Sequence, residues 1–144
     1  MLRKKAAAAV KRFFGLQNYE FTRVEIKREV IEAICEFAQE AHPKEFIMLL
    51  QGRAKEGVLQ VNSLYYQEYF SNEDSAMPYI RLPIFGDIVG SVHSHPGPSN
   101  KPSSADLQFF AKHGMVHLII RYPYQMGDIK AYSSSGLHLE FEVA

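Results

Sequence analysis

The sequence predicts an α/β domain of the α+β type, in which helices lie on both faces of a mixed, largely antiparallel β-sheet. Three observations predict it: several short apolar runs of strand length, at least two segments with helical spacing, and no strict alternation of strand and helix. The chain has 144 residues, of which 47% are hydrophobic, enough for one compact domain. We expect that domain to span residues 24–144, after a basic tail or short helix at residues 1–23.

The first half of the chain contains one helix and two strands. Residues 24–41 place apolar side chains at helical spacing, and His42-Pro43 ends the helix. Residues 45–52 form a short apolar run that predicts a buried strand headed by Glu45. Residues 58–69 alternate in character, which predicts a second strand paired with the first across residues 53–57. The polar residues 71–78 read as a surface loop.

The second half alternates buried strands with one helix before a closing hairpin. Residues 88–96 form an apolar run that turns to histidine at its carboxyl end. Residues 103–114 predict a helix that starts at Ser103 and stops at Gly114. Residues 115–123 predict a third buried strand, and residues 128–136 and 137–144 a final hairpin.

Composition excludes several classes of protein. Lys plus Arg equals Asp plus Glu at 16 each, so the net charge does not indicate binding to nucleic acid or to a membrane surface. The apolar stretch at residues 6–10 is shorter than a signal-peptide core, and no run of transmembrane length follows, so we expect a cytoplasmic protein. The single Cys35 excludes an intramolecular disulfide and a multi-cysteine zinc site, and we expect it to pack as a small hydrophobe.

The histidine pair at the end of the strand at 88–96 is a candidate metal site. His93 and His95 are two residues apart, so in a strand they project from the same face and can reach one ion. The structural alternative is a pair of core or surface histidines at a strand end. Either way, any metal is held by His and carboxylate side chains, because the chain has one cysteine.

Asp106 is the third candidate ligand. Ser103 and Asp106 also fit a capping box, so helix capping alone can explain these two residues. Capping does not explain why a loop rich in proline and glycine, residues 96–102, leads the helix start back to two histidines. Such a loop has few conformations and holds Asp106 near His93 and His95 at a modest cost in entropy.

Two histidines and one carboxylate suit Zn²⁺, and three protein ligands leave a fourth position open, which indicates catalysis. Hydrolysis of a peptide bond also needs a base that takes up a proton and delivers it to the leaving amine. Glu45, at the start of a buried strand, is the candidate base, although it could be a solvated residue at a strand end.

These residues together resemble the motif of a known family. A glutamate at the start of an apolar strand, then His93-x-His95-Pro96, seven intervening residues and Ser103-x-x-Asp106 is similar to the motif of the JAMM, or MPN-plus, metalloproteases, zinc-dependent isopeptidases that include deubiquitinases. The similarity covers residues 26–132, and the short chain resembles the small stand-alone archaeal and bacterial members. The resemblance implies a cytidine-deaminase-like JAMM/MPN architecture.

The resemblance also implies a role for each residue. His93, His95 and Asp106 would bind one Zn²⁺, Glu45 would activate water, and Ser103 would stabilise the oxyanion of the tetrahedral intermediate. One position departs from the pattern, because many members have a glycine three residues after the glutamate, where this chain has Met48. The departure concerns the packing beneath Glu45 and leaves the metal ligands unchanged.

The substrates implied are ubiquitin-like modifier proteins and their conjugates, cleaved after a Gly-Gly tail. An extended tail can be held by strand addition to a sheet edge, and we expect residues 71–82 to supply that edge. The candidate contacts in this segment are Ser71, Asn72, Met77, Pro78 and Arg81. The oligomeric state stays open, a homodimer included.

Two other functions remain as alternatives. A peptidase that removes adducts from a sulfur-carrier protein would use the same chemistry, and a non-catalytic MPN-type scaffold would use none of it. The remaining histidines suggest no second site: Gly114 breaks any helix between His113 and His117, so a second zinc pair is not expected. His113 should end a helix, and His42 and His138 should lie on a loop and on a strand surface.

Overall fold

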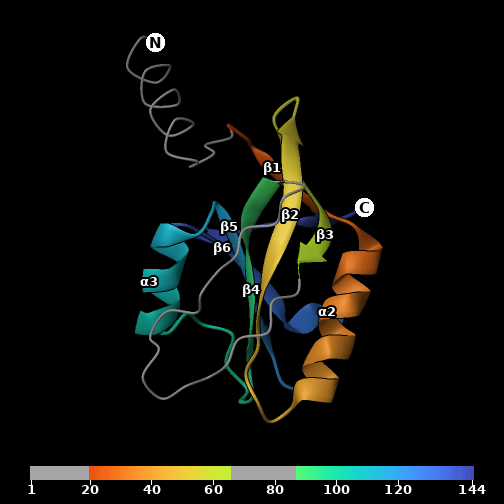
Figure 1. Ribbon diagram of the computed structural model, residues 1–144, viewed down its shortest axis with the longest axis vertical. Helices are drawn as coiled ribbons and strands as arrows, with labels where there is room; N and C mark the ends of the chain where they lie inside the picture. Colours follow the sequence, from red (N-terminus) through yellow and green to blue (C-terminus); the bar gives the residue numbers. More distant parts are fainter. Residues whose placement is uncertain (1–19, 66–86) are drawn as a thin grey trace.

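The computed structural model describes residues 20–65 and 87–144, and in this part of the chain a mixed sheet carries a helix on each face (Figure 1). In chain order the elements are β1 (Arg23–Ile26), α2 (Arg28–Ala41), β2 (Ile47–Lys55), β3 (Val58–Tyr65), β4 (Asp87–His95), α3 (Ser104–Lys112), β5 (Val116–Arg121), the 3₁₀ turn η1 (Met126–Asp128), β6 (Ile129–Ser133), β7 (His138–Leu139) and β8 (Glu142–Val143).

The described strands run in the order β7-β6-β5-β4-β2-β3-β1-β8. β4 pairs in parallel with β5, and β1 pairs in parallel with β3 and β8. The pairs β2·β3, β2·β4, β5·β6 and β6·β7 are antiparallel. The expected α+β class is therefore confirmed, and so is the pairing of β2 with β3. Residues 66–69, predicted to continue β3, lie outside the described residues.

The sheet is curled so strongly that its two edges come together. β7 and β8 lie at opposite ends of the strand order, yet only Glu140 and Phe141 separate them along the chain. An extended chain spans at most about 3.6 Å per residue, so Leu139 and Glu142 lie within roughly 11 Å of each other. A flat sheet with this strand order would hold its edge strands about 34 Å apart. The sheet therefore bends around the core on its inner face.

α2 covers the inner face through one apolar stripe. Its buried residues recur at helical spacing and join a core to which β1 to β6 all contribute. Cys35 packs half-buried against this core, where burial raises the pKa of its thiol. Met48, the residue that departs from the family motif, belongs to the same core. The buried residues of α2 are Val30, Ile31, Ile34 and Ala38.

The expectation that this helix begins at Val24 is wrong. Val24 and Ile26 are buried on the strand β1, which pairs with β3, and Lys27 is extended before α2 starts at Arg28. Ile26 and Val30 are four residues apart, which is a helical spacing. Apolar spacing alone therefore does not show where β1 ends and α2 begins. Pairing with β3 decides the matter, because its edge offers the backbone of β1 hydrogen bonds.

The final hairpin is confirmed only in part. β6 turns at Gly136 and pairs antiparallel with β7, as expected. Beyond Leu139 the chain leaves the hairpin, and β8 pairs in parallel with β1 at the other edge. Ala144 continues this junction, because its amide donates to Ile26 and its carbonyl accepts from Arg28. The hairpin was predicted from the local sequence pattern, which carries no signal for the pairing of β8 with β1 across the curled sheet.

α3 lies on the opposite face of the sheet from α2 (Figure 1). It joins the parallel neighbours β4 and β5, as a crossover helix does. Phe109 and Phe110 of α3 pack with Leu49, Ile119 and Tyr132 in a second, smaller core. The predicted strand at 88–96, helix at 103–114 and strand at 115–123 are confirmed.

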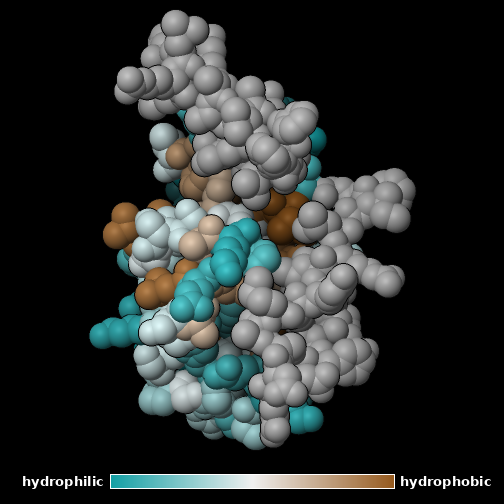
Figure 2. Space-filling model, turned by 60° about the vertical axis from the view of Figure 1, so that its left-hand side comes forward, coloured by the Kyte–Doolittle hydropathy of each residue, from teal (hydrophilic) through white to brown (hydrophobic). Residues whose placement is uncertain are grey.

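No helix among residues 20–65 and 87–144 is long and apolar enough to span a bilayer. On the face shown in Figure 2, hydrophobic residues form separate patches among hydrophilic ones. The exposed large hydrophobic side chains of the described residues lie on helices and in turns, namely Phe37, Leu107, Tyr122, Met126 and Leu137.

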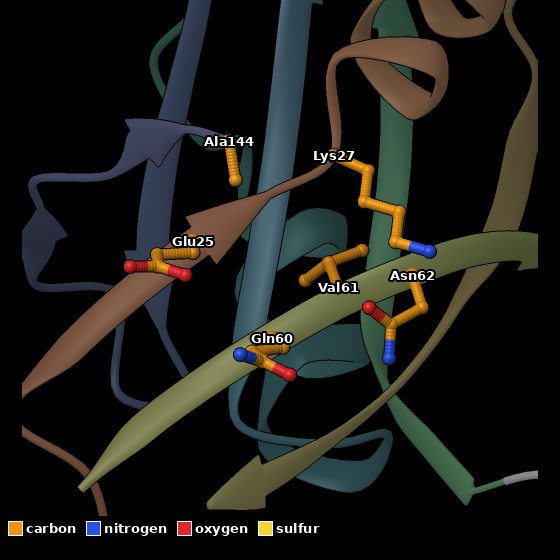
Figure 3. Close-up of a pocket in the computed structure, with 6 residues that line it drawn as sticks. All are labelled: Glu25, Lys27, Gln60, Val61, Asn62 and Ala144. Carbon is orange, nitrogen blue, oxygen red and sulfur yellow. The ribbon is translucent and has the colours of Figure 1, made fainter.

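A hollow of about 100 Å³ lies beside β1, β3 and the last residue of the chain (Figure 3). Val61 of β3 lines this hollow and pairs with Gly52 of β2. Gly52 in turn pairs with Asp87, the first residue of β4, so the hollow lies level with the start of β4. His95 is eight residues further along β4, about 26 Å away at the rise of a strand. The hollow is therefore separate from the histidine pair.

Candidate metal centre

His93 and His95 come from the last residues of β4, a central strand flanked by β2 and β5. Both project toward α3, because residues two apart on a strand share a face. His93 is 4% exposed and lies edge-on to Phe109 and Phe110, at ring-centroid distances of 4.9 and 5.4 Å. The smaller core therefore holds the His93 ring in one orientation.

Asp106 meets both histidines from the first turn of α3. Its Oδ1 lies 3.4 Å from Nδ1 of His93, and its Oδ2 lies 3.0 Å from Nε2 of His95. The expected capping box is present as well, because Oδ2 of Asp106 accepts from the Ser103 amide and Oγ of Ser103 accepts from the Asp106 amide. One carboxylate thus caps the helix and joins the two rings.

The loop between β4 and α3 is held by more than its prolines. Asn100 is 3% exposed; its side chain donates to the carbonyl of Asp128 at 3.0 Å, and its carbonyl accepts from the hydroxyl of Tyr132 at 2.8 Å. The amide of Tyr122 donates to Gly97 at 3.2 Å. These bonds place the start of α3 beside the histidines. Sequence reasoning missed Asn100 because an asparagine in a proline-rich loop is equally common on a surface turn.

The histidine–aspartate cluster is electrostatically coupled. Burial raises the pKa of the Asp106 carboxyl, but the hydrogen bonds from His93, His95 and the Ser103 amide outweigh it and hold that pKa well below its usual range. The hydrogen bond to Asp106 raises the pKa of His95 against the opposing effect of burial. Asp106 is therefore a carboxylate at neutral pH, as a metal ligand must be.

The two histidines differ in how their second ring nitrogen is held. Nδ1 of His95 lies 2.9 Å from the carbonyl oxygen of Ser99, which can only accept, so this nitrogen carries a proton. In the neutral ring that a metal would bind, the lone pair is then on Nε2, the nitrogen that faces Asp106. Nε2 of His93 lies 2.9 Å from the hydroxyl of Ser91, which can accept or donate. Ser91 in turn lies 2.6 Å from Nδ1 of His117.

Ser91 and His117 were not singled out as site residues from the sequence. Both are fully buried and lie in register on β4 and β5, facing α3. Burial lowers the pKa of His117 to about 3, so the ring is neutral. A polar residue inside an apolar strand is the signal that could have identified each of them, because a buried polar group needs a partner. As expected from the sequence, His113 ends α3, and Gly114 follows with φ +117°.

Glu45 lies beside the histidines without touching them. It precedes β2, whose Ile47 pairs with His93, and Phe46 exchanges two hydrogen bonds with Ser94, so Glu45 comes opposite His95. Residues opposite each other on antiparallel strands share a face. Glu45 is exposed, and its charge contributes to the raised pKa of His95. The carboxylate is therefore accessible from solvent at the edge of the cluster.

Ser103 is exposed at the same edge. Its Oγ accepts the Asp106 amide at 3.1 Å, which uses a lone pair and leaves the hydroxyl proton available. The cap therefore orients a hydroxyl donor near His95 and Asp106. The candidate substrate contacts Ser71, Asn72, Met77, Pro78 and Arg81 lie outside the described residues.

The donor set fits zinc chemically, although no complete ion cage is formed. Among residues 20–65 and 87–144, no group of three or more His, Cys, Asp or Glu side chains is arranged to hold a metal as it stands. Asp106 instead contacts each ring through a different oxygen. The N···O separations of 3.0 and 3.4 Å are close to the donor spacing of about 3.3 Å around tetrahedral Zn²⁺. The residue types and these two separations are therefore compatible with zinc chemistry.

The family model for prokaryotic homologues of the JAB domain matches residues 27–134. The chain belongs to this family. The match covers both helices, the histidine pair and Asp106, and it confirms the resemblance read from the motif.

Relatives of this JAB-domain chain agree with the assignment. A probable metalloprotease of Haloferax volcanii is 34% identical, and the match covers 78% of this chain and 74% of that protein. The crystal structure of a JAB1/MPN-domain protein from Archaeoglobus fulgidus is 32% identical with a TM-score of 0.66, over 85% of this chain and 98% of that one. A structure described as a JAMM metalloprotease-like zinc site in the proteasome and signalosome is 34% identical with a TM-score of 0.63, over 85% and 99%.

Proposed function

We propose that this JAB-domain protein is a zinc-dependent metalloprotease that hydrolyses peptide or isopeptide bonds after the Gly-Gly terminus of ubiquitin-like proteins. The observation that carries the proposal is the meeting of His93, His95 and Asp106 at one end of β4, with an outer partner on each ring. The family and the metalloprotease-like relatives support the same chemistry.

His93 through Nδ1, His95 through Nε2 and Asp106 would hold the ion. When bound there, Zn²⁺ acts as a Lewis acid and lowers the pKa of a water molecule to about 7. Glu45 takes a proton at its carboxylate and delivers it to the leaving amine; its position opposite His95 and its exposure suit that task. Ser103 donates a hydrogen bond from its hydroxyl to the developing oxyanion.

The substrate class is the finer part of the proposal. It is supported by the motif resemblance and by the exposure of Glu45 and Ser103 beside the end of β4. We propose that residues 71–82 contribute an edge for an extended tail, with Ser71, Asn72, Met77, Pro78 and Arg81 as contacts. The peptidase acting on sulfur-carrier adducts would share this site, and the scaffold alternative would not hydrolyse at all.

The test is an assay on a Gly-Gly-linked ubiquitin-like conjugate from the host, combined with elemental analysis for zinc. We expect one zinc per chain, cleavage that a chelator abolishes, and recovery on addition of Zn²⁺. Cleavage confined to a sulfur-carrier adduct would favour the narrower peptidase. Zinc-loaded protein that cleaves neither conjugate would contradict the proposed activity and favour the scaffold.

A further inference from the structure

The residues behind the candidate ligands form a continuous buried chain of hydrogen bonds. Ser91 stands between His93 and His117, with its Oγ 2.9 Å from Nε2 of the first and 2.6 Å from Nδ1 of the second. Ser91 and His117 are 0% exposed, and the His117 ring stacks on Phe110 at 4.4 Å. Water does not reach either side chain, so the protons must be shared within the chain.

A serine hydroxyl has one proton, so it donates to one ring and accepts from the other. In the first arrangement, Nε2–H of His93 donates to Ser91, and Ser91 donates to Nδ1 of His117. In the second, His117 donates to Ser91, and Ser91 donates to His93, whose proton then lies on Nδ1. Only the first arrangement leaves Nδ1 of a neutral His93 ring with a lone pair that a metal can bind; in the second, Nδ1–H points toward Oδ1 of Asp106.

The surroundings of His117 favour the first arrangement. The backbone carbonyls of Gly114 and Phe110 act on the His117 ring to favour a proton, although none completes a hydrogen bond with its buried Nε2. Carbonyl groups only accept, so they favour N–H at Nε2 over a bare lone pair. With the proton of the neutral ring on Nε2, Nδ1 of His117 must accept from Ser91.

We infer that Ser91 and His117 are positioning residues that keep the proton of His93 on Nε2 and so present Nδ1 as a metal ligand. The inference rests on the proposed zinc site and deepens it. Each candidate histidine ligand then has a partner that fixes its tautomer. For His95 the partner is the backbone carbonyl of Ser99, and for His93 it is the hydroxyl of Ser91, which donates to His117. Outer partners of this kind typically strengthen metal binding 10- to 100-fold.

The first test measures zinc affinity of the full-length protein by competition with a chelator. We expect Ser91→Ala and His117→Leu each to weaken binding by about 10- to 100-fold. His117→Asn should stay close to wild type, because Oδ1 of asparagine lies where Nδ1 of histidine accepts. Ser94→Ala is the matched control: Ser94 is equally buried on β4, but its Oγ accepts from the Phe46 amide and touches neither ring.

The second test reads the tautomer directly. In the zinc-loaded protein, the ¹⁵N shifts of the His93 ring should place the proton on Nε2, and Ser91→Ala should alter the Nε2 signal while leaving that of His95 unchanged. Far-ultraviolet circular dichroism checks that each variant is folded. If Ser91→Ala does not fold, the comparison of His117→Leu with His117→Asn still decides the question.

The outcomes separate the inference from the proposed function. Wild-type affinity in both Ser91→Ala and His117→Leu, or equal losses in Ser94→Ala and Ser91→Ala, would overturn the inference and leave the zinc site standing. Equal losses of zinc affinity in His117→Leu and His117→Asn would also overturn it. Such a result would mean that an acceptor for the Ser91 hydroxyl, which asparagine keeps and leucine lacks, has no effect on zinc binding. Failure of the wild-type protein to bind zinc would remove the proposed function itself.

Discussion

At the scale of single residues, Asp106 has two tasks that require the same charge state. As a helix cap it accepts the Ser103 amide, and as a candidate ligand it faces His93 and His95. Both tasks need a carboxylate, and its lowered pKa secures one across the physiological range. Asp is short enough to remain at the helix start while its two oxygens reach separate rings.

Glu45 and Asp106 should separate chemistry from metal binding. Glu45→Gln removes the base but no ligand, so we expect kcat to fall about 10²- to 10⁴-fold with zinc content unchanged. Asp106→Ala should instead lose zinc. Assays on a Gly-Gly conjugate and elemental analysis measure the two effects, and Glu40→Gln, an exposed residue of α2, is the control. Full activity in Glu45→Gln would show that another group moves the proton.

His117 should make the zinc-free protein less stable in acid. Its pKa is about 3 in the fold and about 6.5 in an unfolded chain, so between these values the unfolded chain binds a proton that the folded ring does not. The free energy of unfolding therefore falls with decreasing pH, by about 2 kcal/mol from pH 6.5 to 5. Asparagine does not titrate, so the free energy of unfolding of His117→Asn should fall by about 2 kcal/mol less than that of the wild type over the same pH range. Urea denaturation at each pH measures this difference. If the free energy of unfolding depended on pH in the same way in both proteins, His117 would be able to take up a proton while the wild-type protein stays folded.

At the scale of elements, the site is assembled where β4 ends and α3 begins. The loop between them is anchored through Asn100 to Tyr132 of β6 and to Asp128 of η1. In the strand order, β6 lies on the side of β4 away from β2. The helix start therefore has a defined place relative to the strand end. A short capped helix on a pinned loop is a stiff support for a carboxylate ligand.

Ser103 should contribute to both the helix and the reaction. Ser103→Ala removes the cap and the hydroxyl, so we expect a loss of about 1 kcal/mol in stability and a fall in kcat of about 10²- to 10³-fold. Ser103→Thr should retain most of both. Ser104→Ala, at the next exposed position, is the matched control. A loss of stability without a loss of kcat would assign Ser103 to the cap alone.

Elements with strong local signals were predicted well, and those decided by pairing were not. The spacing of apolar residues sufficed for α2, β4 and β5, and the serine–aspartate signature for the start of α3. Val24 and Ile26 fit a helix and a strand equally, and the edge of β3 selected the strand. β8 is two residues long, too short for any periodicity to predict.

At the scale of the whole molecule, the curled sheet separates two hydrophobic cores. The larger core fills the inner face beneath α2 and includes Ile26, whereas the smaller core beneath α3 surrounds His93 and includes Ile119. Ile119 pairs with His93 in register. Stability is therefore shared by both cores, but the site is built on one of them.

The two cores should respond differently to the same deletion. Ile26→Ala and Ile119→Ala remove the same atoms from sites that are 0% exposed, so each should lower the free energy of unfolding by about 2–5 kcal/mol. Zinc affinity of the folded protein should fall only in Ile119→Ala, because its cavity loosens the His93 ring. Urea denaturation and zinc competition measure the two quantities. Equal zinc affinities would mean that Phe109 and Phe110 alone hold the ring.

The sequence by itself determined the candidate ligand set and its chemistry, because two-residue spacing on a strand and a capped helix start are local patterns. It also determined most strands and both helices, whose apolar faces repeat over short distances. Only the tertiary structure placed Glu45 opposite His95, joined β8 to β1 and put Ser91 between His93 and His117. Those arrangements depend on which strands become neighbours, and that is decided by burial of the whole sheet rather than by any one segment.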